Sequence, residues 1–266
     1  MDKKRKNGYD VLVEGLALHF KTFGNIEQIY QNEGHKTLFD FYIKRHHDLK
    51  TLKTLILSKY LPITQEIILQ ETKSLRSSKY KKLLNISDED FKEPVYELIR
   101  LAYVGLFHKY ENFAKNLLDC LVLCNPNTFT SRSELDKFFQ ESFSFSMVDW
   151  HISKSIKRIN WICNTIKHND SYINKSKEIP EEFINHSHDK KLKLSSQDFK
   201  RDVDIIIHFY EAFFKVCSQL TILKEMLTEN EGDIELFGEE FMVNKRKRVD
   251  DLKSQIKQIF ESIKSL

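Results

Sequence analysis

Apolar residues recur at steps of three and four over most of the chain, a spacing that is typical of amphipathic α-helices. The steps continue over several helical turns at a time, which is longer than an ordinary strand. Short groups of polar residues, Gly or Pro separate these stretches. Helices are therefore predicted over five stretches: residues 9–60, 63–84, 90–124, 146–168 and 197–228.

Local signals predict where these helices begin and end. Leu61-Pro62 interrupts the first pattern, and proline is expected to end that helix because it removes a helical hydrogen bond. Ser87 with Asp90, and Ser195 with Asp198, have the spacing in which a serine caps the helix that follows. The polar residues between the last two predicted helices indicate a long loop.

The last part of the chain has a seam of apolar residues at nearly heptad spacing, interrupted by Lys245. A helix with such a seam packs either on its own bundle or on a second chain, and the sequence leaves both open. The seam consists of Met242, Val249, Leu252, Ile256, Ile259, Ile263 and Leu266. Three parts are thus expected: a helical extension (1–88), a central bundle (89–230) and a terminal amphipathic helix (231–266).

Composition agrees with an all-α fold. Only 7 Gly and 4 Pro occur in 266 residues, while 41% of the residues are hydrophobic, so the chain has few tight turns for its length. No run approaches the roughly 18 apolar residues of a membrane span, and no signal peptide is recognisable. The four cysteines lack metal-type or disulfide-type spacing. A cytoplasmic protein without membrane contact, bound metal or cofactor is expected.

Charge is balanced overall but locally positive. The chain has 42 Lys and Arg against 39 Asp and Glu, a net charge of +3, which is too small to predict nucleic-acid binding by the whole surface. Residues 150–201 contain 11 basic against 6 acidic side chains, a net charge of +5. Any site for a polyanion is expected in this segment.

One acidic residue stands within an apolar stripe of the predicted helix 90–124. Glu111 follows Val104 and Phe107 and precedes Ala114 and Leu118 at steps of three and four. A bare carboxylate is costly to bury, so Glu111 should find a partner. It either bonds to a neighbouring group inside the bundle or orients a functional site.

The most informative stretch is Trp161-Ile-Cys-Asn-Thr-Ile-Lys-His-Asn-Asp170, at the end of the predicted helix 146–168. Asn164 and His168 are four residues apart, and they therefore share one helix face. Cys163 belongs to the apolar stripe of the same helix, which predicts a packing role for its thiol.

The acid within one helix and the Asn-x-x-x-His ending of a later helix together resemble the HEPN superfamily. The resemblance covers about residues 90–228. It implies an all-α bundle, a homodimer, and a role in prokaryotic defence, toxin or stress systems. It also implies RNA as the partner, with metal-independent RNA cleavage in the ribonuclease members. A toxin of this kind has a protein antitoxin as a further partner.

The resemblance implies a role for each matching residue. His168 takes the place of the family histidine, a general acid or base, and Asn164 that of the polar residue that follows the family arginine and holds either the phosphate or His168. Glu111 matches the acid that orients the site. Cys163 falls where active members have an arginine, and a neutral thiol cannot stabilise charge on the scissile phosphate.

Three nearby cations are candidates for RNA contacts. Lys157 shares nearly the same face as His168 but lies about 16 Å away along the helix axis, and Arg158 is turned off by about 80°. Lys167 is adjacent to His168 but points elsewhere. A cation of a second chain in a two-fold dimer is a further source of positive charge.

Other interpretations remain open for each residue. His168 at a helix end is favoured by the helix dipole whether or not it acts on RNA. Lys157 and Arg158 fit a solvated face equally well. The missing arginine favours a competing function, in which the bundle is a non-catalytic module that recruits another protein.

Overall fold

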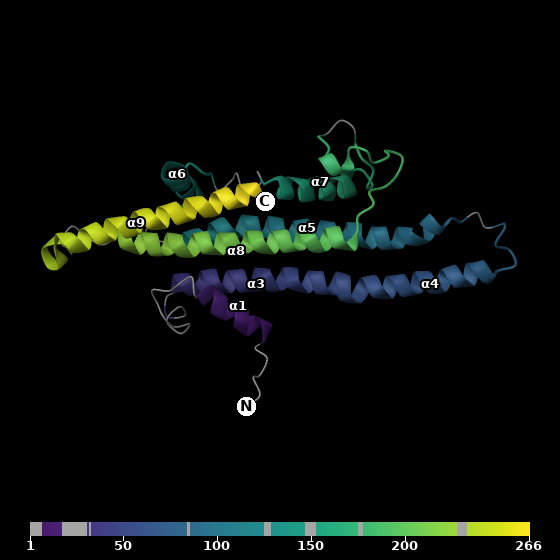
Figure 1. The fold of residues 1–266 in the computed structure, drawn as a ribbon, viewed down its shortest axis with the longest axis horizontal. Coiled ribbons are helices and arrows are strands. Elements are labelled where there is room, and N and C mark those ends of the chain that lie inside the picture. The colour runs from purple at the N-terminus through teal and green to yellow at the C-terminus, as the bar shows by residue number, and fades with distance from the viewer. Residues whose placement is uncertain are drawn as a thin grey trace, which may run out of the picture. The chain divides into compact units, whose positions relative to one another are not determined.

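The computed structural model describes residues 7–17, 31, 33–83, 86–124, 129–146, 153–174, 178–227 and 233–266. Within these ranges the chain is helical apart from its loops and one isolated bridge between Tyr172 and Lys191, which confirms the all-α fold class (Figure 1). The α-helices are α1 (Gly8–Ala17), α3 (Glu33–Leu55), α4 (Leu61–Ser77), α5 (Asp88–Cys124), α6 (Arg132–Phe143), α7 (Lys154–His168), α8 (Ser196–Leu227) and α9 (Asp233–Ser265). Two short elements complete the list: the π-helical turn η2 (Ile56–Tyr60) and the 3₁₀ turn η4 (Glu181–Phe183).

The prediction that Leu61-Pro62 ends a helix is wrong. The π-helical turn η2 joins α3 directly to α4, and Pro62 stands in the first turn of α4. A proline in mid-helix has no N–H to donate and its ring crowds the carbonyl four residues earlier. The wider π turn accommodates this local mismatch, because its hydrogen bonds span five residues.

Serine caps begin two helices where the sequence predicts them. At α5, the amide of Asp90 donates to Ser87 Oγ (3.3 Å), and the amide of Ser87 donates to the Asp90 carboxylate (2.7 Å). The same reciprocal pair joins Ser195 and Asp198 at α8, with distances of 3.0 and 3.2 Å. Each pair satisfies N–H groups that the first turn of a helix leaves without partners.

The region before α7 differs from the prediction. No helix is predicted between residues 124 and 146, but residues 132–143 form α6, and Ser131 caps this helix by accepting from the amide of Glu134. The helix predicted from residue 146 begins only at Lys154, after its own cap, Ser153. Residues 147–152 lie outside the described residues.

Two compact units divide the chain, and each unit combines segments that are distant in the sequence. The first consists of Met1–Lys44, Ala114–His151 and Phe209–Ser265, and the second of Arg45–Phe113, Ile152–His208 and Leu266. This arrangement differs from the three consecutive parts expected from the sequence. Helices α3, α5 and α8 contribute residues to both units.

In the first unit, the terminal helix α9 packs on α6 through aromatic side chains. Phe260 is 1% exposed and stacks on Phe145, with ring centroids 4.0 Å apart and planes inclined by 12°. Phe139 and Phe143 meet the same ring edge-on at 5.6 and 6.0 Å. Of the two open interpretations of the apolar seam, intramolecular packing therefore holds for this end of α9.

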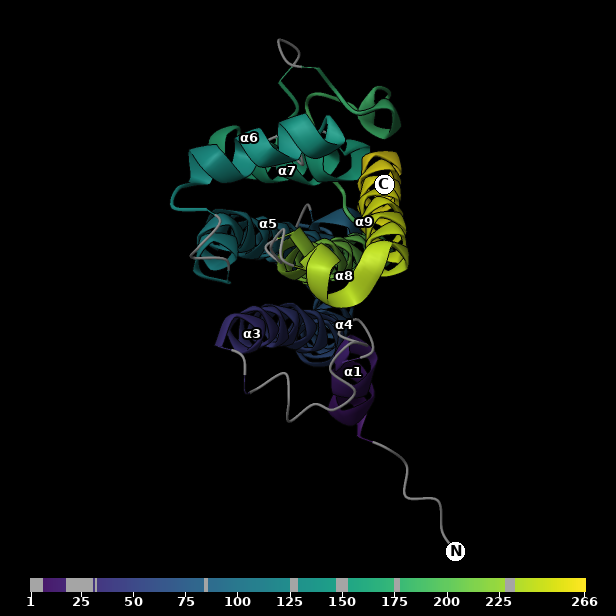
Figure 2. The ribbon, with the colours of Figure 1, turned by 90° about the vertical axis from the view of Figure 1, so that its left-hand side faces the viewer.

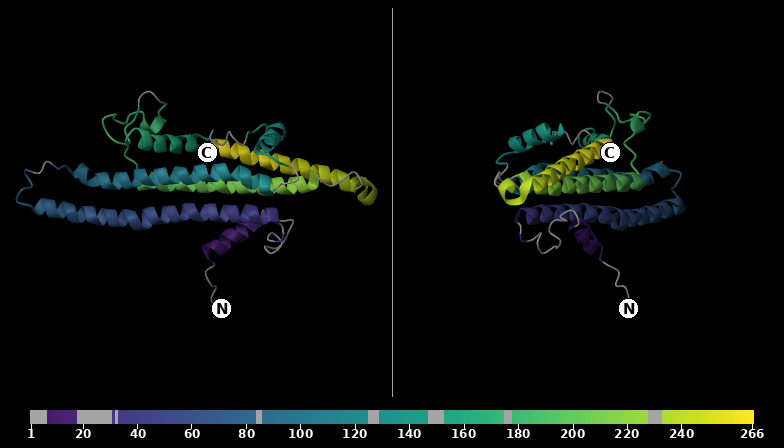
Figure 3. Two further views of the ribbon diagram at one scale, coloured as in Figure 1. Left: turned by 180° about the vertical axis from the view of Figure 1, so that it is seen from behind. Right: turned by 60° about the vertical axis from the view of Figure 1, so that its left-hand side comes forward.

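The second unit contains all the predicted site residues. Its parts of α5 and α8 lie side by side, with α7 on one side of them and α3 on the other (Figures 1 and 2). The loop after α7 lies next to that helix (Figure 3). Arg100 of α5 holds this loop, because its buried guanidinium donates to the Leu192 carbonyl at 3.0 Å.

Candidate functional site

The sequence-predicted site lies at the C-terminal end of α7. The chain leaves this helix sharply after His168, because Asp170 and Ser171 adopt left-handed backbone conformations with φ of 48° and 70°. The amides of Asn169 and Ser171 both donate to the Thr165 carbonyl, at 3.2 and 3.1 Å. This closure fixes the last turn of the helix that carries Asn164 and His168.

Cys163 is fully buried and has two charged neighbours. Burial raises the pKa of its thiol, while the ammonium of Lys167 beside the sulfur lowers this pKa and the carboxylate of Glu111 raises it further. The structure therefore brings Glu111 of α5 within electrostatic range of Cys163. It also places the Lys167 ammonium beside Cys163, whereas the sequence predicts only that this lysine points away from His168.

The polar residues are not joined into one hydrogen-bonded site. The amide nitrogen of the half-buried Asn164 donates to Asn160 Oδ1 at 2.9 Å, one turn earlier in α7. His168 is exposed and, within the described part of the chain, makes no hydrogen bond or ion pair. Glu111 is half-buried and likewise bonds to neither of them among the described residues. An imidazole in this setting is free to meet a ligand but is not held in a catalytic orientation.

The cations of α7 differ in how they are used. Lys157 and Lys167 are exposed, as expected for side chains available to phosphates. Lys154 is 82% exposed and lies 3.4 Å from Glu181, an ion pair that water screens almost fully. At 100° per residue, Lys154, Lys157 and His168 fall on one face of the helix, within about 60° of each other.

Arg158 does not lie on a solvated face, and that interpretation is wrong. Its side chain is only 13% exposed, and the guanidinium forms ion pairs with Asp202 of α8 and Glu182 of the loop. Asp202 is itself buried and also accepts a hydrogen bond from the Tyr103 hydroxyl at 2.6 Å. Arg158 therefore holds α5, α7 and α8 together instead of facing a ligand.

Sequence reasoning missed this buried cluster, although a signal was present. Asp202 stands between Phe199 and Ile206 on a stripe of α8 that is otherwise apolar. This is the same anomaly that drew attention to Glu111. A buried carboxylate must be paired, so its position in the stripe predicts a cationic partner on a neighbouring helix.

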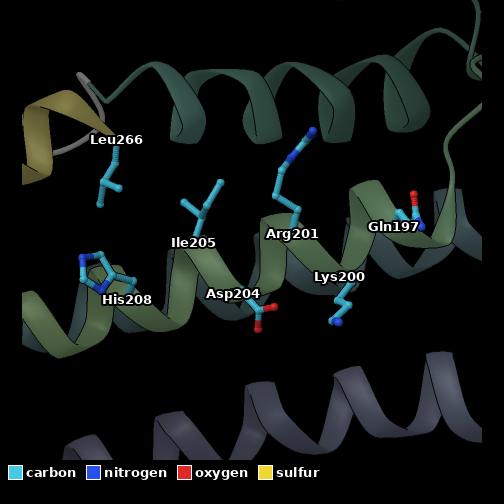
Figure 4. A pocket seen from close by; sticks show the side chains of 7 residues that line it. All are labelled: Gln197, Lys200, Arg201, Asp204, Ile205, His208 and Leu266. Carbon is cyan, nitrogen blue, oxygen red and sulfur yellow. The ribbon is translucent and has the colours of Figure 1, made fainter.

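A second candidate surface is a shallow groove of about 620 Å³ along α8. Figure 4 shows that its side chains point in different directions: Arg201 and Ile205 extend towards α7, while Lys200 and Asp204 extend towards α3. Asp204 forms an ion pair with Lys53 of α3. Because these groups do not converge, the groove is a less suitable ligand site than the face of α7.

Comparison of the chain with protein-family models, with curated proteins and with solved structures finds no match. The described residues contain no group of three or more metal-ligating side chains. None of the described helices combines the length and the apolar character that crossing a membrane requires.

Proposed function

We propose that this protein binds RNA on the exposed face of α7 in the second unit. The observation that carries the proposal is the pair of exposed cations there: neither Lys157 nor Lys167 forms an ion pair with an acidic side chain among the described residues, although the Lys167 ammonium also lies beside the Cys163 thiol. Both lysines belong to the segment 150–201, whose net charge is +5. Exposed Lys side chains on one helix bind the phosphate backbone without requiring a particular sequence.

The proposal includes membership of the HEPN superfamily with a degenerate site. Glu111, Asn164 and His168 correspond to its acid, polar residue and histidine, and Lys167 supplies positive charge beside the position that Cys163 occupies. In this account the protein is a homodimer and serves a prokaryotic defence, toxin or stress system. RNA is its ligand, and a protein antitoxin is a candidate partner.

Removing both exposed lysines tests RNA binding. The double variant Lys157→Ala/Lys167→Ala should bind a fluorescent single-stranded RNA at least 10-fold more weakly, because two phosphate contacts are lost. Each contact on single-stranded nucleic acid contributes about 0.7 to the slope of log affinity against log salt, so that slope should fall by about 1.4. Fluorescence anisotropy at several salt concentrations measures both quantities.

Lys257→Ala on α9 is the matched control, because this lysine is also exposed but belongs to the first unit. It should leave the affinity and the salt slope nearly unchanged. Equal losses in the control and in the double variant would mean that RNA binds through general charge and not through α7.

A non-catalytic protein-interaction module is the second candidate function. Two observations favour it: Cys163 is 0% exposed, so no arginine-like charge projects from its position, and α4 exposes apolar side chains. Ile63 and Ile67 are 55% and 54% exposed, one turn apart on the same side of that helix. The two candidate functions make opposite predictions about RNA cleavage when Cys163 is replaced by arginine.

Cys163→Arg is expected to give metal-independent RNA cleavage in EDTA. The new guanidinium has the Glu111 carboxylate within electrostatic range, and thermal denaturation checks that the variant stays folded although position 163 is fully buried. Adding His168→Ala to this variant should abolish the new cleavage, because the imidazole is the acid or base. A folded Cys163→Arg protein that cleaves no RNA would support the interaction module instead.

A further inference from the structure

A partly enclosed cavity of about 540 Å³ lies between the N-terminal half of α7 and the loop segment 178–182. Its volume is within the range of natural small-molecule sites. It belongs entirely to the second unit and differs from the exposed end of α7 around His168. The lining residues are Lys154, Lys157, Arg158, Trp161, Glu178, Ile179, Pro180, Glu181 and Glu182.

The cavity has a rigid aromatic wall. Trp161 stacks on the buried Phe183, with ring centroids 5.2 Å apart and planes inclined by 17°. The guanidinium of Arg158 lies 5.8 Å from the centroid of the Phe183 ring, and its ion pairs fix it there. An indole held in this way offers a flat surface on which a planar ring of a ligand can stack.

Some of the charged side chains that line the cavity form ion pairs with one another. Lys154 pairs with Glu181, and Arg158 pairs with Glu182. Lys157 and Glu178 remain, and neither has a hydrogen-bond or ion-pair partner among the described residues. The cavity thus presents one uncommitted cation and one uncommitted carboxylate beside an indole.

We propose that this cavity binds a guanine nucleotide. Trp161 stacks on the base, Lys157 binds the phosphate, and Glu178 accepts hydrogen bonds from the base edge. Guanine offers two adjacent donors, N1–H and the 2-amino group, to the two oxygens of one carboxylate. Adenine has an acceptor at N1, which repels a carboxylate, so the site prefers guanine.

The nucleotide is either free or an unpaired residue of an RNA chain, since both present the same base and phosphate. The cavity shares Lys157 with the proposed RNA-binding face of α7, but Trp161 and Glu178 have no part in that proposal. Binding of GMP alone therefore tests the cavity even if the protein fails to bind RNA.

Isothermal titration of the full chain with GMP, AMP and guanosine tests the proposal. GMP should bind about 10-fold or more tightly than AMP, as one bidentate contact to a base provides. Glu178→Gln should reduce GMP binding to the level of AMP, while Glu66→Gln, an exposed residue of α4, should change neither. Lys157→Met should weaken GMP binding but leave guanosine binding unchanged.

The variant Glu178→Gln is the decisive one, because Glu178 is exposed and its replacement should not disturb folding. Equal affinity for GMP and AMP in the wild type, or no binding of GMP at millimolar concentration, would overturn the proposal. Competition of GMP with an oligoadenylate that contains one guanosine shows whether the natural ligand is a free nucleotide or a residue of an RNA chain. Competition between this RNA and GMP supports the RNA residue, and GMP binding without competition supports the free nucleotide.

Discussion

Replacing Asp202 with asparagine is expected to lower the free energy of unfolding by about 3–5 kcal/mol, as the loss of one partner from a buried ion pair does. Asp202 is 1% exposed and accepts from both Tyr103 and Arg158. Asparagine leaves the half-buried guanidinium with Glu182 as its remaining partner. Urea denaturation followed by circular dichroism measures the change.

Asp204→Asn is the matched control, two residues away on the same helix. Asp204 is 50% exposed and pairs with Lys53 near the protein surface, so its loss should cost about 0–1 kcal/mol. Combining Asp202→Asn with Arg158→Met should restore part of the lost stability, because no unpaired charge then remains inside. Similar costs for Asp202→Asn and Asp204→Asn would show that the cluster does not stabilise the unit.

Truncating Phe260 to alanine is expected to lower the free energy of unfolding by about 3–5 kcal/mol, which is the second large effect. The ring is almost fully buried among Phe139, Phe143 and Phe145, so its removal leaves a cavity that the rigid neighbours cannot fill. The free energy of unfolding of the Phe260→Ala protein, measured in urea, checks the value.

Phe241→Ala tests the exposed part of the same helix. This ring is 40% exposed, and its truncation should cost much less than that of Phe260. A result in which Phe260→Ala costs under about 1 kcal/mol would contradict the packing of α9 on α6, because burial of a whole aromatic ring contributes more than that.

Much of the fold could be predicted from apolar spacing and from serine caps. The helix around Glu111 and the helix after Ser195 begin and end close to the predicted residues, because their long stripes outweigh local preferences. Pro62 shows the limit of such reasoning. The rule that proline ends the preceding helix holds only where the turn before the proline is regular α-helix. Here that turn is π-helical, and a π turn cannot be recognised from the sequence.

The candidate site could be predicted in part. Residue spacing along one helix is enough to place Asn164 and His168 on a shared face, but contacts between helices are not local. The approach of Glu111 to Cys163 and the pairing of Arg158 with Asp202 depend on how α5, α7 and α8 pack. The position of Lys167 beside Cys163 could have been predicted, because Lys167 is four residues after Cys163 and therefore one turn away on the same side of the helix.

Cross-linking of RNA to the protein tests the central claim most directly. A short RNA with 4-thiouridine is irradiated with the full chain, and the attached peptides are identified by mass spectrometry. The account predicts cross-links within α7 and the residues that directly follow His168. Cross-links confined to the other basic runs, Lys245–Arg248 or Lys3–Lys6, would contradict an RNA-binding face on α7.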